Sequence, residues 1–496
     1  MIDISGITLT DGGVNEVLNE TGVRFETDDA ALQRLFDAAE GKCGRNIRMF
    51  GGRKVLVEGG GYEKAWLETQ PMGGGMYAKR DLTVALNNQL IFIDGQRADG
   101  RMPGSLQCMP DGTVEPQYNK LQGFCFPEHA LDVWYLTGRD PAYLDALADC
   151  LRRFDEYLQR TRDSDGDGLL ESWCVYDTGE DNALRYGKAP VYWTEDAPPV
   201  NADTVPMASM DVTSYSYACR ETLRQISLLR GNAADAETWR VKACETAALL
   251  KKGLWDERRS ACYDRDRTGR VIDVLCHNNL RCMYWGSFSQ EMADRFVSEH
   301  LLNENEFLTP LPLPSVAVND PMFRNIPANN WSGQCEGLTY QRAIPALERY
   351  GYEKTVTYLG HRLLDTVVRN GYLFTQQYDP FTGAASRVGM YSHDVTAADA
   401  DEPVQDAYGP TVLACLEYIS HIWGVELKRD EVWFSAGKGM PYTYEQRFGE
   451  KTYGIVSDGR GAELFFGRKR ICRVTCGCRI ICDRNGEILR SVGIED

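Results

Sequence analysis

Apolar residues recur along the middle of this chain at the spacing of amphipathic helices. In the segment 141–160, for example, Leu147, Leu151, Phe154 and Leu158 follow one another at steps of three and four, which places them on one face of a helix. Roughly eleven segments between residues 30 and 425 show this period. The clearest of them span residues 141–160, 211–229, 233–254, 354–369 and 410–423.

Several predicted helices end at a glycine, and the next helix begins at once. The glycines are Gly138, Gly231, Gly286 and Gly351, and glycine ends a helix because it readily adopts the left-handed conformation. Short connections make consecutive helices antiparallel, so the pattern predicts repeated helical hairpins. Between the hairpins lie long loops rich in Trp, Tyr and Gly, at residues 61–78, 97–126, 162–206, 305–335 and 375–408.

Long loops in a compact domain are usually functional when they are not disordered. A ring of hairpins with all such loops at one end is an α/α barrel. We therefore predict a mainly α fold, an (α/α)6 barrel, with an open helical solenoid as the alternative.

The end of the chain, from residue 428 onward, changes to short β-forming segments. Strands are expected at 431–435, 453–456, 462–466, 470–482 and 488–492, with turns rich in Asp and Gly between them. The chain then divides into three regions. They are a short N-terminal extension at 1–28 that could add a strand or two, the barrel at 29–427, and a small β domain at 428–496.

Charge and cysteine usage narrow the class of protein. The 496 residues carry a formal net charge of −18, which argues against nucleic acid or an anionic membrane as a partner. No apolar run reaches the ~20 residues that span a bilayer, and the first residues lack the basic and apolar parts of a signal peptide. Sixteen cysteines are dispersed through apolar segments, so we expect reduced thiols in a cytoplasmic protein.

Two clusters have the residue types of metal sites. Asp163, Asp165 and Asp167 match the start of a calcium loop, but the twelfth position is Cys174 where calcium loops carry Glu. A tight turn explains the three aspartates, and a structural calcium ion is the alternative. The other cluster comprises four cysteines on one face of the predicted strand 470–482. A straight strand cannot easily wrap four thiolates around zinc, so we predict buried packing. The cysteines are Cys472, Cys476, Cys478 and Cys482.

The loop 176–186 concentrates groups that can transfer protons. Asp177, Glu180 and Asp181 lie close together in it, near Arg185. Neighbouring negative charge raises the pKa of a carboxyl group, and such an acid can protonate the leaving oxygen when a glycosidic bond is cleaved. A solvated acidic loop is the alternative.

Three further loops combine aromatic, acidic and basic side chains. Trp331 could stack on a sugar ring or pack in the core, and the other loops could be solvated. The side chains are Trp331 and Glu336 in one loop, Tyr378 and Asp379 in another, and Arg80 and Asp81 in the third.

At these residues the sequence resembles the six-hairpin α/α-barrel glycosidases, most nearly glycoside hydrolase family 63 and the mannosylglycerate hydrolase-like proteins, with trehalase a more distant relative. The resemblance covers residues 60–425. It is carried by Asp-Gly-Asp-Gly-Leu at 165–169, Gly-x-Asp-Asn-x-x-Arg at 179–185, Tyr-Asp-Pro-x-Thr-Gly at 378–383 and Gln-Asp-Ala-Tyr-Gly-Pro at 405–410. It implies an inverting glycosidase for an α-linked glucoside- or mannoside-like substrate, with Asp181 as the general acid.

The chain departs from this family at the general base. The family's base is a glutamate two residues before the Tyr-Asp pair, and that position holds Gln376. An amide cannot take a proton from water at neutral pH. Three explanations stay open. Another carboxylate serves, with Glu336 the first choice and Asp379 the second; phosphate is the nucleophile of an inverting phosphorylase; or the barrel binds sugar without cleaving it.

We predict a hydrolase with Asp181 and Glu336 as catalytic residues, a carbohydrate as partner and no cofactor. The residues expected to bind substrate are Arg80, Asp81, Asp177, Asn182, Arg185, Trp331, Gln376, Tyr378 and Asp379. Some of the arginines, with Arg101, could pair with an anionic aglycone or brace acidic loops. A sugar epimerase that works through histidine pairs is disfavoured, because the acidic loop contains no histidine. The pattern does not indicate an oligomeric state.

Overall fold

The computed structural model describes most of the chain, namely residues 21–326, 331–386 and 405–496. Parts of the predicted N-terminal extension and of two predicted loops, at 1–20, 327–330 and 387–404, lie outside the described residues. The described part contains twelve α-helices, close to the number that the helical period predicts. They are α2 (Ala30–Arg45), α3 (Gln70–Tyr77), α4 (Leu82–Asp94), α5 (Pro127–Leu136), α6 (Pro141–Thr161), α7 (Met210–Leu229), α8 (Ala233–Leu254), α9 (Asn278–Trp285), α10 (Gln290–Phe296), α11 (Gly337–Glu348), α12 (Glu353–Arg369) and α13 (Gly409–Trp423).

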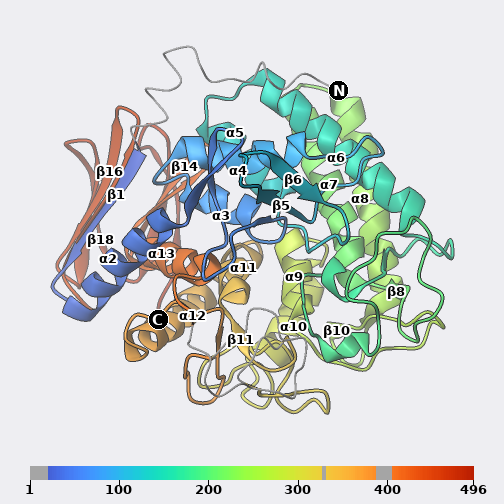
Figure 1. Cartoon of the computed structure of the whole chain (residues 1–496). Helices are drawn as coiled ribbons and strands as arrows, with labels where there is room; N and C mark the ends of the chain where they lie inside the picture. Colours follow the sequence, from blue (N-terminus) through green and yellow to red (C-terminus); the bar gives the residue numbers. More distant parts are fainter. Residues whose placement is uncertain (1–20, 327–330, 387–404) are drawn as a thin grey trace.

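Alternate helices along the chain form a closed inner ring. Helix α3 contacts α5, α5 contacts α7, α7 contacts α9, α9 contacts α11, α11 contacts α13, and α13 returns to α3. The other helices alternate with these along the chain, and α4, α8, α12 and α2 each pack against members of the ring. Figure 1 shows this arrangement, with the β strands of the chain's end to one side. The predicted (α/α)6 barrel is confirmed.

The two kinds of helix differ in how their side chains are buried. The outer helix α6 buries the predicted stripe that includes Leu147, Leu151 and Phe154, and it exposes the opposite face. The inner helix α13 is buried along its whole length, because other elements cover every side of it. A helix that is apolar all round is typical of such a position.

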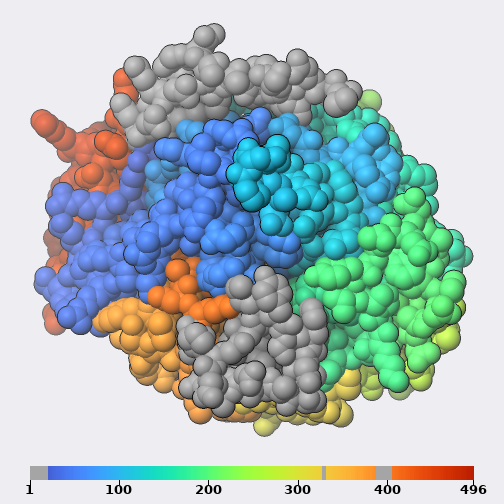
Figure 2. All heavy atoms as spheres, viewed as in Figure 1, coloured from blue at the N-terminus to red at the C-terminus, as the bar shows by residue number. Residues whose placement is uncertain are grey.

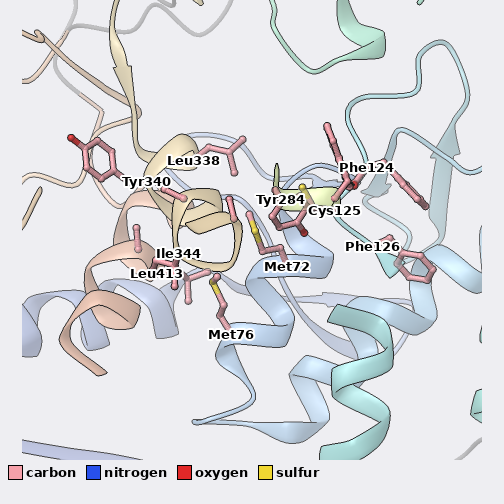
Figure 3. Packing of buried hydrophobic residues seen from close by; sticks show 14 of the residues in the cluster. Met72, Met76, Phe124, Cys125, Phe126, Tyr284, Leu338, Tyr340, Ile344 and Leu413 are labelled. Carbon is pink, nitrogen blue, oxygen red and sulfur yellow. The ribbon is translucent and has the colours of Figure 1, made fainter. Parts of the chain in front are cut away.

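The inner helices meet in an apolar core. Figure 3 shows Met72 and Met76 of α3 facing Leu338 and Ile344 of α11, with Leu413 of α13 beside them. All five are buried. Burying each such side chain contributes roughly 1.5–3 kcal/mol before the loss of conformational entropy is subtracted, so contacts between helices far apart in sequence hold the ring closed.

The β strands near the end of the chain form two antiparallel sheets, and the N-terminal strand joins one of them. The strand β1 (Thr21–Thr27) pairs with β15, so the predicted extension is part of the C-terminal β region. Figures 1 and 2 show the first described segment, in blue, beside the strands of the chain's end, in red, at one edge of the molecule. One sheet has the order β1-β15-β16-β17-β18 and the other β13-β14-β19-β20. Their strands are β13 (Val425–Lys428), β14 (Glu431–Ala436), β15 (Tyr442–Phe448), β16 (Lys451–Ser457), β17 (Gly461–Phe466), β18 (Lys469–Thr475), β19 (Cys478–Asp483) and β20 (Ile488–Gly493).

The predicted strand 470–482 is wrong in one respect, because it is two strands. The chain turns at Gly477, whose φ is +100°, and β18 and β19 belong to different sheets. The four cysteines therefore do not share one strand face, although Cys476 and Cys482 are buried as expected. All sixteen cysteines lie in described residues and are free thiols.

Short strands lie within the loops of the barrel. They are β2 (Ile47–Phe50), β3 (Arg53–Leu56), β4 (Ala65–Trp66), β5 (Ser105–Cys108), β6 (Val114–Gln117), β7 (Glu171–Ser172), β8 (Met207–Ala208), β9 (Trp255–Asp256), β10 (Ala261–Cys262), β11 (Cys335–Glu336) and β12 (Gln377–Tyr378). Short helical turns also occur, at η2 (Val175–Asp177), η3 (Leu184–Tyr186) and η4 (Val297–Leu301). Among the described helices, none combines the length and the apolar character that a membrane crossing requires.

Candidate active site

A cavity of about 300 Å³ opens at the end of the ring where the inner helices begin. Its lining residues lie in the loops that precede α3, α5, α7, α11 and α13. These are the long loops that the sequence predicts at one end of the barrel. Because helix N-termini carry a partial positive charge, this end of the ring favours negatively charged groups.

Asp181 lines the cavity and is half-buried. The loop that carries it passes very close to Glu68. Gly179 has a φ of +74°, and a Cβ atom there would lie 2.1 Å from Oε2 of Glu68. A position that is both left-handed and this crowded accepts only glycine. Gly179 thus brings the carboxylates of Asp181 and Glu68 to the same part of the cavity wall.

Buried ion pairs hold the acidic loop in place. Arg185 pairs with Glu180 at 2.5 Å and also with Asp264, and all three are buried. Burial alone would raise the pKa of Glu180, but the charges of Arg185 and Arg281 outweigh it and hold that pKa well below its usual range. Arg185, predicted as a substrate ligand, does not line the cavity because its guanidinium is engaged in bracing the loop.

Asp177 anchors the start of the same loop. One of its oxygens accepts hydrogen bonds from Arg162 at 2.6 Å and from the backbone N–H of Trp173 at 2.8 Å, and the other accepts one from the N–H of Leu121 at 2.8 Å. Burial would raise the pKa of Asp177, but Arg162 and the backbone hydrogen bonds lower it overall. Asp177 is fully buried and does not line the cavity. It is therefore a residue that positions the acidic loop.

Trp331 lines the cavity, as the sequence predicts, although little of it is exposed. Its backbone N–H donates a hydrogen bond to Oδ1 of Asn182 at 2.9 Å. Asn182 therefore joins the acidic loop to the loop that precedes α11. The Arg281 guanidinium lies 5.4 Å from the indole centroid, so the ring is both part of the core and part of the wall.

Gln376 also lines the cavity, and the hydroxyl of Tyr62 donates a hydrogen bond to its Oε1 at 2.9 Å. The two residues predicted beside it have other roles. Tyr378 is buried, with its hydroxyl bonded to the carbonyl of Leu373. Asp379 accepts hydrogen bonds within its own turn and from Asn325, so it does not reach the cavity.

Glu336 lies behind the cavity wall. It is fully buried, and the Gln377 amide donates a hydrogen bond to Oε1, while Oε2 has no hydrogen-bond partner among the described residues. Burial raises the pKa of Glu336 well above its usual range, and the charge of Asp181 adds to the effect. Burial therefore favours the protonated form of Glu336, and its side chain does not line the cavity.

Arg80 and Asp81 lie away from the cavity. Arg80 pairs with Glu40 of α2 at 2.6 Å, and Asp81 is the N-cap of α4, where it accepts a hydrogen bond from the N–H of Val84. Arg101 is also buried outside the cavity lining. The three residues do not line the cavity, and Arg80 and Asp81 have structural partners, so substrate binding by these two stays a prediction.

Three cavity carboxylates, those of Glu58, Glu63 and Glu68, are absent from the predicted site. Glu68 pairs with the buried guanidinium of Arg342 at 3.1 Å, although burial raises the pKa of Glu68 overall. Glu58 lines the cavity just before the run Gly59 to Gly61. A single acid ahead of glycines is typical of an ordinary loop, and only its place after an apolar strand could have drawn attention to it.

An aromatic and basic surface completes the cavity. The Nζ atoms of Lys64 and Lys120 lie 5.4 and 5.1 Å from the ring centroid of Trp66, and Nζ of Lys120 also lies 5.3 Å from Tyr192. Burial first and the charge of Lys64 second lower the pKa of Lys120 to about 8. This side of the cavity therefore offers flat ring faces next to two cations.

The three aspartates that match the start of a calcium loop meet in a tight turn, as predicted. Asp163, Asp165 and Asp167 bring one oxygen each within 4.8 Å of the others. Backbone N–H groups of Gly168 and Leu169 donate to Asp163 and Asp167, as in a turn stabilised by its own side chains. Calcium binding stays a prediction.

Comparisons with known proteins agree with the fold. A family model described as the mannosylglycerate hydrolase MGH1-like glycoside hydrolase domain matches residues 75–394, about two thirds of the chain. Asp181 and the loop before α11 fall within the match.

Solved structures with this architecture include three that illustrate its range. A mannosylglycerate hydrolase of glycoside hydrolase family 63 from Thermus thermophilus, in complex with glucose, has a TM-score of 0.59 and 19% identity over 77% of this chain and 99% of its own. A sialidase has a TM-score of 0.69 and 15% identity over 95% of this chain and 42% of its own. Neutral trehalase from Saccharomyces cerevisiae has a TM-score of 0.54 and 15% identity over 77% of this chain and 79% of its own. At these identities the likeness supports the fold alone.

Proposed function

The chain belongs to the family of mannosylglycerate hydrolase MGH1-like glycoside hydrolases, and we propose that it hydrolyses an α-linked glucoside- or mannoside-like substrate with inversion at the anomeric carbon. The observation that carries the proposal is the position of Asp181. It reaches the cavity from a loop that three buried ion pairs hold rigid, beside aromatic side chains.

Asp181 is proposed as the general acid that protonates the leaving oxygen. It lines the cavity with Trp331, Trp66 and Tyr176, and flat rings of this kind stack on the apolar faces of sugars. The cavity volume of about 300 Å³ lies at the small end of the range for small-molecule sites, so it favours a short glycoside over a long polymer.

Hydrolysis is favoured over phosphorolysis by the charges around the cavity. Glu58, Glu63, Glu68 and Asp181 all line it, against Lys64 as the lining cation. A phosphate dianion would be repelled by each of these carboxylates that is ionised, with Lys64 and Lys120 acting in the opposite direction, whereas a water molecule carries no charge. The absence of a base at Gln376 therefore does not by itself make phosphate the nucleophile.

The variant Asp181→Asn tests the proposed acid. We expect it to hydrolyse unactivated disaccharides about 10²–10⁴-fold more slowly than the native enzyme, because the leaving oxygen then departs without a proton. Rates would be measured by sugar release, with the anomer of the first product followed by NMR. Phosphate-dependent turnover, retention of configuration, or a fully active variant would contradict the proposal.

A further inference from the structure

Glu58 is held at the cavity by the backbone on both sides of it. Its N–H donates to the carbonyl of Lys64 at 3.2 Å, and its own carbonyl accepts from the N–H of Gly409 at 2.6 Å. Gly409 is the first residue of α13. The loop after β3 is thus fastened to the N-terminus of an inner helix, and the Glu58 side chain projects into the cavity lining.

Glu58 and Gln376 share one region of the wall. The Tyr62 hydroxyl bonds to Gln376, and the backbone of Tyr62 pairs with Gly59, next to Glu58. The Tyr62 ring also lies edge-on to Tyr408 at 6.2 Å, and Tyr408 lies near enough to the Glu58 carboxyl to lower its pKa. Glu58 therefore lies beside the position at which a carboxylate is missing.

The other carboxylates near the cavity are engaged or out of reach. Glu68 is paired with Arg342, and Glu63 with Arg48 at 2.7 Å. Glu336 is closed off behind the wall, where it bonds to Gln377. Glu58 makes no ion pair with any described residue, which leaves its carboxyl available to a bound water molecule.

We propose that Glu58 is a catalytic residue, the general base that replaces the missing carboxylate at Gln376. The proposal rests on the hydrolytic function proposed above. Glu58 takes a proton from water as the water oxygen bonds to the anomeric carbon, and the glycosidic C–O bond breaks. The leaving oxygen takes a proton from Asp181. Proton exchange with solvent then returns both groups to their starting states.

The surroundings of Glu58 suit a strong base. Burial raises its pKa well above the usual range, the charges of Glu68 and Asp181 raise it further, and Tyr408 acts in the opposite direction. A carboxylate with a raised pKa, once ionised, accepts a proton from water more readily than an ordinary one does.

Glycosyl fluorides separate the roles of the two carboxylates, since fluoride leaves with little need for an acid. With α-mannosyl and α-glucosyl fluoride, we expect Glu58→Gln to lose about 10²-fold or more in kcat/KM, whereas Asp181→Asn keeps most of its activity. With unactivated disaccharides both variants should be slow. Adding azide to Glu58→Ala should restore fluoride release and give a glycosyl azide of inverted configuration, because azide attacks without losing a proton.

A control variant, the thermal midpoints of all variants and the variant Glu336→Gln make the result decisive. Glu237→Gln, at an exposed glutamate of α8 outside the cavity, serves as the matched control, and the thermal midpoint of each variant reports its folding. Near-native fluoride hydrolysis by Glu58→Gln would overturn the proposal, as would loss of that activity in Glu336→Gln alone. If the native enzyme hydrolyses neither kind of substrate, the hydrolytic function itself fails, and the role of Glu58 fails with it.

Discussion

At the scale of single residues, the carboxylates around the cavity differ in what neutralises them. Asp177 and Glu180 each face a buried arginine, and their pKa values are lowered. Glu58 and Glu336 pair with no cation among the described residues, and burial raises the pKa of both. The first two stay ionised near neutral pH and hold the loop, whereas the last two can carry a proton.

Gly179 is the residue on which the spacing of the cavity acids depends. We expect Gly179→Ala to lower kcat/KM by roughly 10²-fold, because its methyl group would overlap the Glu68 carboxylate and shift the loop that carries Asp181. Steady-state kinetics on a disaccharide would measure the loss.

Gly231 provides the matched control for this substitution. It lies in the turn between α7 and α8 with a φ of +71°, and nothing lies within 4 Å of a Cβ atom there. Gly231→Ala should therefore cost similar backbone strain, about 1–2 kcal/mol, with kcat/KM unchanged. Equal kinetic losses in the two variants would refute the role assigned to Gly179.

At the scale of elements, the ring fixes the inner helices, and the loops that line the cavity lead into these helices. The strand β1 connects the β region to the barrel. Phe25 of β1 packs edge-on to Phe36 of α2 at 5.3 Å and lies 6.1 Å from Tyr444 of β15. One aromatic side chain thus links the first barrel helix to the C-terminal sheet.

Removing this side chain should loosen the link. Phe25→Ala is expected to cost about 3–5 kcal/mol of unfolding free energy, because it leaves a cavity between α2 and the sheet. Arg24→Ala on the same strand, where the side chain is 71% exposed, should cost less than about 0.5 kcal/mol. Urea unfolding of both variants would measure this, and similar losses would contradict the packing role.

At the scale of the whole molecule, the β region docks at the end of the ring opposite the cavity. Lys79, just beyond the C-terminus of α3, lies 2.6 Å from both Glu417 of α13 and Glu426 of β13. Close by, His421 of α13 and Arg479 of β19 both contact Glu348 at the end of α11. Cations at helix C-termini also complement the helix dipole.

The charge of Lys79 decides how this docking responds to pH. Burial would raise the pKa of Glu426, but Lys79 and His421 lower it to about 2. In the native protein Glu426 therefore contributes stability that is lost only as the pH falls from about 4.5 towards 2. Glu417 behaves in the opposite way, since burial raises its pKa despite Lys79.

Lys79→Ala should destabilise the protein most at neutral pH and less at lower pH. The two glutamates would then lack their shared cation, so we expect a loss of about 3–5 kcal/mol at pH 7 that shrinks as the pH falls towards 5 and the carboxyls are protonated. Thermal midpoints from pH 5 to 8 would measure this, with Lys251→Ala at an exposed site of α8 as the control. A loss that grows as the pH falls would contradict the expectation.

The sequence alone determined the features that depend on local physics. Helix periodicity predicted α6, α7, α8, α12 and α13 to within one or two residues, because amphipathic spacing and glycine stops act over a few neighbours. The same local pattern missed β13, β15 and the turn at Gly477, since strand pairing is set by distant partners. The loop motif around Asp181 drew attention to a residue that does line the cavity.

Only the tertiary structure decided which charged residues face the cavity. Arg185 and Asp177 stand in the same loop as Asp181, yet buried partners hold them in the core. Glu58 and Gln376 are separated by more than half of the chain, yet they share one wall because the ring closes through α13 and α3. Burial and pairing set which acid can exchange a proton, and both depend on contacts between segments that the sequence keeps far apart.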